Sequence, residues 1–461
     1  MIRFIYNLFW PIGLLFFLPG YFLKMVRRGG YREKFGQRLG IYDRELCACL
    51  SKQKSTWLHA VSVGEVNIAL KLANALRVVE PDLRCVVTTT TTTGFALANK
   101  NAPPWIEVMY TPLDYWTIIR RAFSVIRPVR IILVEAEIWP NLAAEAHTRR
   151  IPLVLVNARL SLRSERRYRQ FRFFVAPTFR LLDLVCVQER EDADRWAALG
   201  VARERIHVVG SIKYDPDGRD QMSEVQEAKH QTRLAWVNSE CPVLFGGSTH
   251  RGEEAILATV FLRLRHQFPS LRLFIAPRHV ERVQEIRAQL TALPLRVGLA
   301  SEAIRQLPDE LDTDCVLLDT TGELQRWYDI ATIVFIGKSL TAHGGQNPVE
   351  PIMAGKAVIF GPHMENFATL AKALRLKKGS IQVRDVDSLE QAIDELLHDT
   401  EVRRQLVQNA REVLSEHHGA TARAAALINE LSSSEHQSSR VYSKSPREQT
   451  ASAGKQEEQQ Q

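Results

Sequence analysis

Residues 343–351 read His343-Gly344-Gly345-Gln346-Asn347-Pro348-Val349-Glu350-Pro351, and an apolar run lies on each side, at 330–336 and 357–360. Both runs are typical of buried parallel strands, so the pattern predicts a strand, a glycine loop and a helix that begins at Asn347. Adjacent glycines let backbone N–H groups approach a ligand closely, and a helix N-terminus attracts anions. The stretch therefore predicts an α/β fold with a phosphate site after a strand. The alternative is ordinary helix capping by Asn347 and Glu350.

Length and charge limit the possible classes of protein. A chain of 461 residues exceeds one hydrophobic core and predicts two domains. A net charge of +8 favours anionic partners, namely nucleotides, anionic lipids or nucleic acids. The six cysteines are scattered without metal-ligand spacing, which indicates a reducing compartment and no metal site.

The N-terminus predicts a membrane anchor over residues 1–28. Residues 4–23 carry no charge, and Lys24, Arg27 and Arg28 follow them. This arrangement places the rest of the chain in the cytoplasm by the positive-inside rule. No small-residue cleavage site follows, so a signal peptide is disfavoured. The segment either spans the bilayer or lies in one leaflet, and a buried core helix is the alternative.

Short apolar runs alternate with amphipathic stretches in the rest of the chain, which predicts two Rossmann-like, doubly wound domains facing a cleft. The first domain covers residues 29–210, with strands expected at 56–63, 84–90, 106–111, 130–136, 152–157, 184–188 and 206–210. The second covers residues 225–431, with strands expected at 243–247, 271–276, 314–318, 330–336 and 357–360. Residues 211–224 are interpreted as a linker and 432–461 as a disordered polar tail.

Carboxylates follow two strands of the first domain. Glu65 stands where a strand gives way to a helix, and there it could take a proton from a hydroxyl nucleophile. The alternative is a Glu that stabilises the first helical turn. Glu135 and Glu137 end an apolar strand on the same face, where unpaired acids are unfavourable to bury, so a functional role is predicted.

An arginine-rich segment with aromatic residues covers 159–174. A solvated helix face is its ordinary explanation. Beside a membrane anchor, it also fits a landing surface for the anionic lipids of the membrane.

Polar corners follow several strands of the second domain. They are Gly247-Ser248-Thr249-His250, Pro277-Arg278-His279 and Thr321-Gly322-Glu323. Together with residues 343–351 they predict a nucleotide pocket. The chain has neither a phosphate-binding loop ending in Gly-Lys-Ser/Thr nor a Gly-x-Gly-x-x-Gly after the first strand, which argues against an NTPase or a dinucleotide enzyme.

These motifs, taken in order with residues 210–215, resemble those of the 3-deoxy-D-manno-octulosonic acid (Kdo) transferases of Gram-negative lipopolysaccharide synthesis. The resemblance covers roughly residues 1–430. It implies a GT-B glycosyltransferase that moves Kdo from CMP-Kdo to the lipid A precursor, lipid IVA. The reaction would take place at the cytoplasmic face of the bacterial inner membrane, with inversion, and with neither a metal nor another cofactor.

The resemblance also implies roles for individual residues. Glu65 matches the general base, and Glu135 and Lys213 match positions of transition-state stabilisation. The CMP-binding segments match Pro277, Arg278, Thr321, Gly322, Glu323, Asn347, Pro348, Val349 and Glu350. The rival functions are a nucleotide-sugar epimerase, a GT-B transferase with a different donor, and a membrane-tethered nucleic-acid binder. Nucleic acid is not an expected partner, because the basic residues form no recognisable RNA or DNA module.

Overall fold

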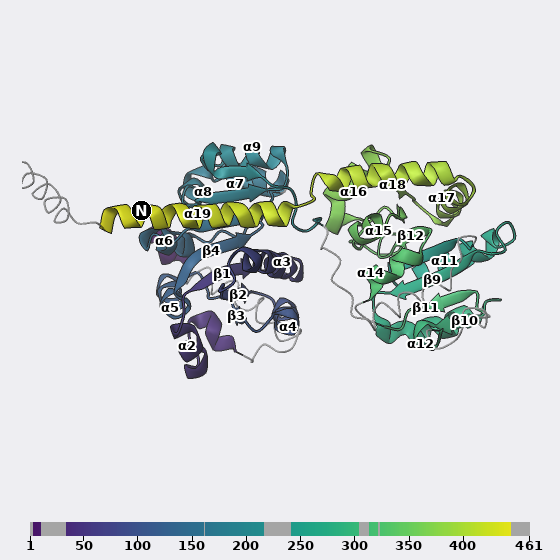
Figure 1. Ribbon diagram of the computed structural model, residues 1–461, viewed down its shortest axis with the longest axis horizontal. Coiled ribbons are helices and arrows are strands. Elements are labelled where there is room, and N and C mark those ends of the chain that lie inside the picture. The colour runs from purple at the N-terminus through teal and green to yellow at the C-terminus, as the bar shows by residue number, and fades with distance from the viewer. Residues whose placement is uncertain are drawn as a thin grey trace, which may run out of the picture. The chain divides into compact units, whose positions relative to one another are not determined.

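The computed structural model describes residues 3–10, 34–160, 162–215, 241–303, 313–320 and 323–443. The chain divides into unit 1, Met1–Asp215 with Gly419–Gln461, and unit 2, Pro216–His418. Each unit contains one seven-stranded parallel sheet (Figure 1). The predicted class, two doubly wound α/β domains, is confirmed. Each unit is described by itself, and the cleft between them stays a prediction.

The sheet of unit 1 has the strand order β3-β2-β1-β4-β5-β6-β7. The strands are β1 (Ser55–Ala60), β2 (Cys85–Thr89), β3 (Ile106–Tyr110), β4 (Pro128–Val134), β5 (Leu153–Ala158), β6 (Leu184–Val187) and β7 (Ile206–Val208). All seven predicted strands are present. The order reverses between β1 and β4, and ligands of such sheets bind at the carboxyl ends of the strands beside this switch point.

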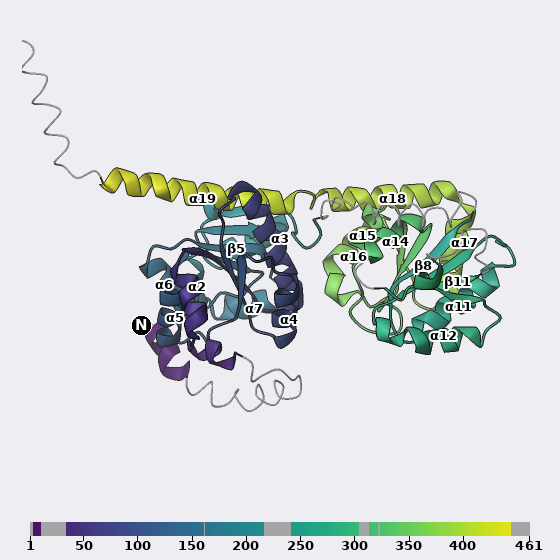
Figure 2. The ribbon, with the colours of Figure 1, turned by 60° about the horizontal axis from the view of Figure 1, so that its bottom comes forward.

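Helices cover both faces of this sheet because strand side chains alternate. Leu58 packs on one side and Trp57 on the other. Figure 2 shows α3 and α4 on one side and α5 and α6 on the opposite side. The first face is covered by α3 (Val63–Val79), α4 (Thr92–Asn101) and α19 (Ala420–Ser443). The second is covered by α2 (Arg44–Ser51), α5 (Trp116–Ile126), α6 (Pro140–Thr148), α7 (Leu162–Gln170), α8 (Arg172–Phe179) and α9 (Arg190–Ala198).

The chain leaves unit 1 after Asp215 and returns to it as α19, drawn in yellow beside unit 1 in Figure 1. Ala424, Ala425 and Ile428 are buried in the core that α3 shares. The Asp215 carboxylate accepts hydrogen bonds from the N–H groups of Gly419 and Thr421, both at 2.8 Å. The exit and the return of the chain are therefore joined at one side chain.

This return differs from the predicted boundaries. Residues from 419 onward belong to unit 1, although the sequence assigned 225–431 to the second domain. Residues 432–443, predicted to begin a disordered tail, continue α19, and 444–461 lie outside the described residues. Ser211, Ile212 and Tyr214, predicted as linker, are buried in unit 1, while 216–224 lie outside the described residues. No local pattern signals that a helix packs on a distant domain.

The first described helix, residues 3–10, is docked by polar contacts. Arg3 Nε and Asn7 Nδ2 donate to Asn141 Oδ1 at 3.1 and 2.9 Å. None of the helices within the described ranges combines the length and the apolar character needed to cross a bilayer. Residues 11–28 of the predicted anchor are not among them, so the anchor stays a prediction.

The sheet of unit 2 has the order β10-β11-β9-β8-β12-β13-β14, with its switch point between β8 and β12. Its strands are β8 (Val243–Thr249), β9 (Arg272–Pro277), β10 (Val297–Leu299), β11 (Cys315–Leu317), β12 (Ile333–Ile336), β13 (Ala357–Phe360) and β14 (Ile381–Gln382). The five predicted strands are present, and β10 and β14 were missed. The helices are α11 (Glu253–Leu264), α12 (Val283–Thr291), α13 (Ala300–Ala303), α14 (Leu324–Trp327), α15 (Val349–Met353), α16 (Ala368–Leu376), α17 (Val386–His398) and α18 (Thr400–Ser415).

The tie at Asp215 gives a stability prediction. Asp215→Ala leaves two N–H donors at the start of α19, the half-buried Gly419 and the buried Thr421, without their carboxylate acceptor, so the free energy of unfolding of unit 1 should fall by about 2 kcal/mol. Urea denaturation followed by circular dichroism measures it. Asp194→Ala is the control, because Asp194 and its partner Arg203 are both mostly exposed. Equal effects of the two substitutions would contradict the role of Asp215.

Candidate active site

Glu65 occupies the first turn of α3, directly after β1. The helix begins at Val63, and Ser62 is its N-cap. Glu65 Oε1 accepts a hydrogen bond from Ser62 Oγ at 2.8 Å, and Oε2 accepts one from the Val61 N–H at 2.9 Å. The side chain is thus held in one orientation, in the first helical turn where the alternative explanation also placed it. Each carboxylate oxygen keeps a second lone pair with which it can accept a proton from a substrate hydroxyl.

Glu135 follows β4, the neighbour of β1 at the switch point. Its backbone has φ 65°, a left-handed conformation that is unfavourable for a residue with a Cβ. Burial raises the pKa of Glu135, the charge of Glu65 raises it further, and the charge of Lys213 lowers it. Residues predicted separately from the sequence therefore share one electrostatic environment. Strained backbone of this kind is concentrated at functional sites.

Glu137 is the third acid of this corner. Burial raises the pKa of Glu137, and the charges of Glu65 and Glu135 add to the effect. The strand alternation predicted for Glu135 and Glu137 does not apply, because β4 ends at Val134, but the coupling shows that Glu137 lies near the other two acids.

Lys213 is brought to the same edge by Asn157, at the end of β5. Asn157 Oδ1 accepts hydrogen bonds from the Ile212 N–H at 3.1 Å and from Ser211 Oγ at 3.3 Å. Burial lowers the pKa of Lys213, and the charge of Glu135 raises it. Lys213 thus lies where its charge stabilises an ionised Glu135.

Arg159 acts on the same groups and was not singled out as a site residue. Its charge lowers the pKa values of Glu135 and Lys213. Its position directly after β5, which ends at Ala158, could have marked it as a site residue. It was instead assigned to the arginine-rich segment.

In unit 2 the switch point is organised by Glu253, the first residue of α11. Its side chain is fully buried, and it accepts four backbone hydrogen bonds. Oε2 accepts from the N–H groups of His250 and Lys338, both at 2.7 Å. Oε1 accepts from Ser339 and Leu340, at 3.0 and 3.1 Å. The loops that leave β8 and β12 are fixed to each other in this way.

Those predicted donor-binding residues that the structure describes lie at the carboxyl ends of the unit 2 strands. Pro277 ends β9, the Arg278 N–H donates to the Thr249 carbonyl at 3.0 Å, and Arg278 is exposed. Glu323 is the N-cap residue of α14. Thr321 and Gly322 lie outside the described residues.

The stretch 343–351 differs from its prediction. Helix α15 begins at Val349 instead of Asn347 and has five residues, too few for a substantial dipole. Asn347 Oδ1 accepts from the Val349 N–H at 3.0 Å, and its Nδ2 donates to Glu350 Oε1 at 3.1 Å. The capping alternative is also wrong in its positions, because Pro348 and not Asn347 is the N-cap residue and no side-chain cap bond forms, although Asn347 and Glu350 do pair with each other. Pro348 and Val349 are buried.

The two glycines of this stretch have a structural reason of their own. Gly344 and Gly345 have φ values of 119° and 67°, which disfavour residues with a Cβ. A Cβ would also lie 2.7 Å from Asn366 Nδ2 at Gly344 and 2.4 Å from Met364 Sδ at Gly345. The fold by itself requires both glycines, so they are no argument for a ligand.

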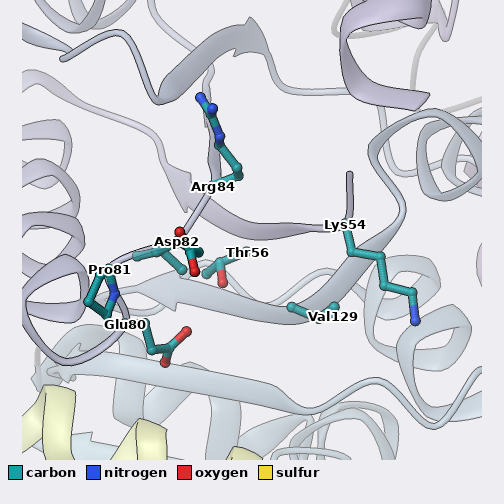
Figure 3. Close-up of a pocket in the computed structure, with 8 residues that line it drawn as sticks. Lys54, Thr56, Glu80, Pro81, Asp82, Arg84 and Val129 are labelled. Atoms are coloured by element: carbon teal, nitrogen blue, oxygen red, sulfur yellow. The ribbon is translucent and has the colours of Figure 1, made fainter. Parts of the chain in front are cut away.

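A surface hollow of about 370 Å³ lies at the opposite, amino end of the unit 1 strands (Figure 3). Its lining includes Lys54, Thr56, Glu80, Asp82 and Arg84. None of the predicted site residues lines it. Because ligands of such sheets bind at the carboxyl ends of the strands, we assign it no substrate.

Comparison with known proteins adds sequence relatives. A family model described as "3-Deoxy-D-manno-octulosonic-acid transferase (kdotransferase)" matches residues 33–216, and one described as "Glycosyl transferases group 1" matches residues 311–413. A 3-deoxy-D-manno-octulosonic acid transferase of Haemophilus influenzae is 33% identical over 407 residues, covering 88% of this chain and 93% of the relative. One of Bordetella pertussis is 31% identical, covering 86% of this chain and 92% of the relative.

Comparison of structures shows the fold. The UDP-GlcNAc 2-epimerase of Neisseria meningitidis, solved with UDP-GlcNAc, superposes with a TM-score of 0.54. It is 10% identical, and the match covers 82% of this chain and 98% of that one. The two-unit architecture is therefore GT-B-like, as predicted, and is shared by enzymes of different activity.

The burial of Glu135 gives a pH-dependent prediction. Its pKa in the folded protein is raised, so ionisation disfavours the folded state above the unfolded pKa of about 4.3. Glu135→Gln removes this penalty, and its melting temperature should exceed that of the unchanged protein at pH 7 to 8. The difference should shrink as the pH falls toward 4. Scanning calorimetry measures it, with the exposed Glu204→Gln as control. A melting temperature below that of the unchanged protein at pH 8 would contradict the assigned environment.

Proposed function

The chain belongs to the 3-deoxy-D-manno-octulosonic acid transferase family, and from this premise we propose that it transfers Kdo from CMP-Kdo to lipid IVA, with inversion and without a metal ion. The observation that carries the proposal is the shared environment of Glu65, Glu135 and Lys213 at the carboxyl ends of neighbouring strands. This is the position at which doubly wound sheets bind their ligands.

Glu65 is the general base of the proposed reaction. Its oriented carboxylate takes the proton of the acceptor hydroxyl while that oxygen forms a bond to the anomeric carbon of Kdo. The bond from this carbon to the CMP phosphate oxygen breaks, and CMP leaves with the electron pair. Ionised Glu135 stabilises the positive charge that develops on the sugar, and Lys213 keeps Glu135 ionised.

The donor belongs to unit 2 in this proposal. The exposed guanidinium of Arg278 at the end of β9 neutralises the CMP phosphate, beside the loop that Glu253 holds in place. Pro277, Glu323, Asn347 and Glu350 border the same carboxyl edge and would contact the rest of the nucleotide.

We place the reaction at the cytoplasmic face of the bacterial inner membrane, with anionic lipids as partners. Two exposed features support contact with a bilayer. Phe4, Leu8 and Phe9 of the first helix are 72%, 58% and 58% exposed. Phe171, Phe173 and Phe174 are exposed in and beside α8, next to the exposed Arg166, Arg167, Arg169 and Arg172. Aromatic rings with neighbouring cations suit the interface of an anionic membrane.

The direct test is transfer by the purified protein. Lipid IVA is incubated with CMP-Kdo formed in situ by a synthetase, EDTA is added after this donor pulse, and the lipid is analysed by mass spectrometry. Mass increments of Kdo that persist with EDTA are expected, and they also count the units added. Folded protein that adds no increment to any lipid A precursor would refute the proposed function.

Glu65→Gln tests the base. The amide preserves the shape of the side chain but cannot accept the proton, so transfer should fall by at least about 100-fold while CMP-Kdo binding survives. Initial rates and isothermal titration measure the two quantities. Glu107→Gln, on β3, is the matched control and should keep its turnover. Undiminished turnover of Glu65→Gln would remove the assignment.

Arg278→Ala tests the donor cation. Loss of a charge-assisted partner of the phosphate should weaken CMP-Kdo binding by roughly 2 to 4 kcal/mol. Titration with CMP-Kdo measures this. Arg404→Ala on α18 serves as the control, because Arg404 is exposed and paired with Glu401. A donor affinity equal to that of the control would contradict the role of Arg278.

Charge reversal at α7 tests the membrane surface. The double variant Arg166→Glu with Arg167→Glu should bind phosphatidylglycerol vesicles at least about tenfold more weakly, since each basic residue near the surface contributes about 1 kcal/mol. Cosedimentation measures binding, and vesicles of phosphatidylcholine should show no difference. Arg203→Glu, at an exposed position, is the control. If the double variant binds like this control, α7 is an ordinary solvated helix.

A further inference from the structure

Two loops of unit 2 bring three possible metal ligands together. His343 lies in the loop after β12, and His363 and Glu365 follow β13. The nitrogen and oxygen atoms that these side chains offer all lie within 4.8 Å of one another. Nδ1 of His343 is 3.1 Å and Nδ1 of His363 is 3.4 Å from the same oxygen, Glu365 Oε1.

The two nitrogen–oxygen separations match those of a metal site. A tetrahedral zinc ion with bonds of about 2.0 to 2.1 Å holds neighbouring ligand atoms about 3.3 to 3.4 Å apart. Both imidazole rings, with centroids 3.9 Å apart, turn Nδ1 toward one carboxylate oxygen. Two imidazoles and a carboxylate are a common ligand set of zinc.

The backbone holds the three side chains in place. Glu365 Oε2 accepts a hydrogen bond from the Gly344 N–H at 2.6 Å, which directs Oε1 toward the imidazoles. The N–H groups of His363 and Asn366 donate to the carbonyls of Ser339 and Gly344, both at 2.9 Å. Such outer contacts orient metal ligands before the ion arrives.

The side chains of His343 and Glu365 are 77% and 55% exposed, so an ion can reach them from solvent.

We propose that His343, His363 and Glu365 bind a divalent transition-metal ion of the zinc type, with the fourth position open to solvent. Each ring binds through Nδ1, and its remaining proton is carried on Nε2. The ion joins the loop after β12 to the loop after β13, beside the Gly344-Gly345 turn. The proposed transfer reaction does not use this ion.

The test uses the full protein freed of metal with EDTA. Cobalt(II) is added alone, its visible absorption reports coordination, and zinc is then added to displace it. We expect one saturable site of four-coordinate character that zinc empties. His343→Ala, His363→Ala and Glu365→Gln should each reduce affinity at least tenfold. His398→Ala is the matched control, because His398 is an exposed histidine of the same unit that also pairs with an acid, Asp394.

Thermal unfolding gives a second readout that does not depend on transfer activity. Saturating zinc should raise the melting temperature of the unchanged protein and of His398→Ala, but not that of Glu365→Gln. The inference is overturned if the three ligand variants bind cobalt as tightly as the control, or if binding never saturates. Transfer that persists with EDTA is compatible with the site, so its failure and that of the proposed function are distinguishable.

Discussion

The buried carboxylate of Glu253 is the constraint on which the ligand-facing end of unit 2 depends. Two loops leave the switch point of the sheet there, and their N–H groups have no strand partner at that depth. A single carboxyl side chain satisfies four of them, and they in turn compensate its loss of hydration. The arrangement holds Lys338 at φ 58°, which is otherwise unfavourable. One of these fixed loops continues to Gly344, and the other follows Thr249, whose carbonyl accepts the Arg278 N–H.

Unit 1 reaches a comparable result with different residues. Glu135 and Asn157 have φ values of 65° and 52° at the ends of β4 and β5, and each directs a polar side chain past the edge of the sheet. Asn157 then holds residues 211 and 212, which places Lys213 beside Glu135. The strained backbone at the strand ends thus places Lys213 next to Glu135, whose pKa is raised by burial. Each unit uses positive φ at its switch point to direct polar groups beyond the sheet.

The sequence predicted what depends on local pattern. β13 agrees with its predicted bounds of 357–360, because a short continuous apolar run between turn residues is typical of a buried strand. β10 and β14, with three and two residues, are too short to show a pattern. The corner acids Glu65 and Glu135 could be found because each follows a strand. The four contacts of Glu253, the return of α19 and the approach of His343 to Glu365 join residues far apart in the chain, and no spacing indicates them.

The protein shares its fold with an epimerase, so the fold alone does not determine the reaction. Each parallel sheet places backbone N–H groups at the carboxyl ends of its strands, where a ligand can bind, and many different reactions can take place at such sites. The reaction depends on which side chains occupy them. Here Glu65, Glu135 and Lys213 share one electrostatic environment. Of the two acids, Glu65 has a fixed direction, because Ser62 and Val61 hold its carboxylate by hydrogen bonds. A proton acceptor needs that fixed direction, whereas an acid that stabilises a developing cation needs its charge. The different supports of Glu65 and Glu135 therefore match the different roles proposed for them.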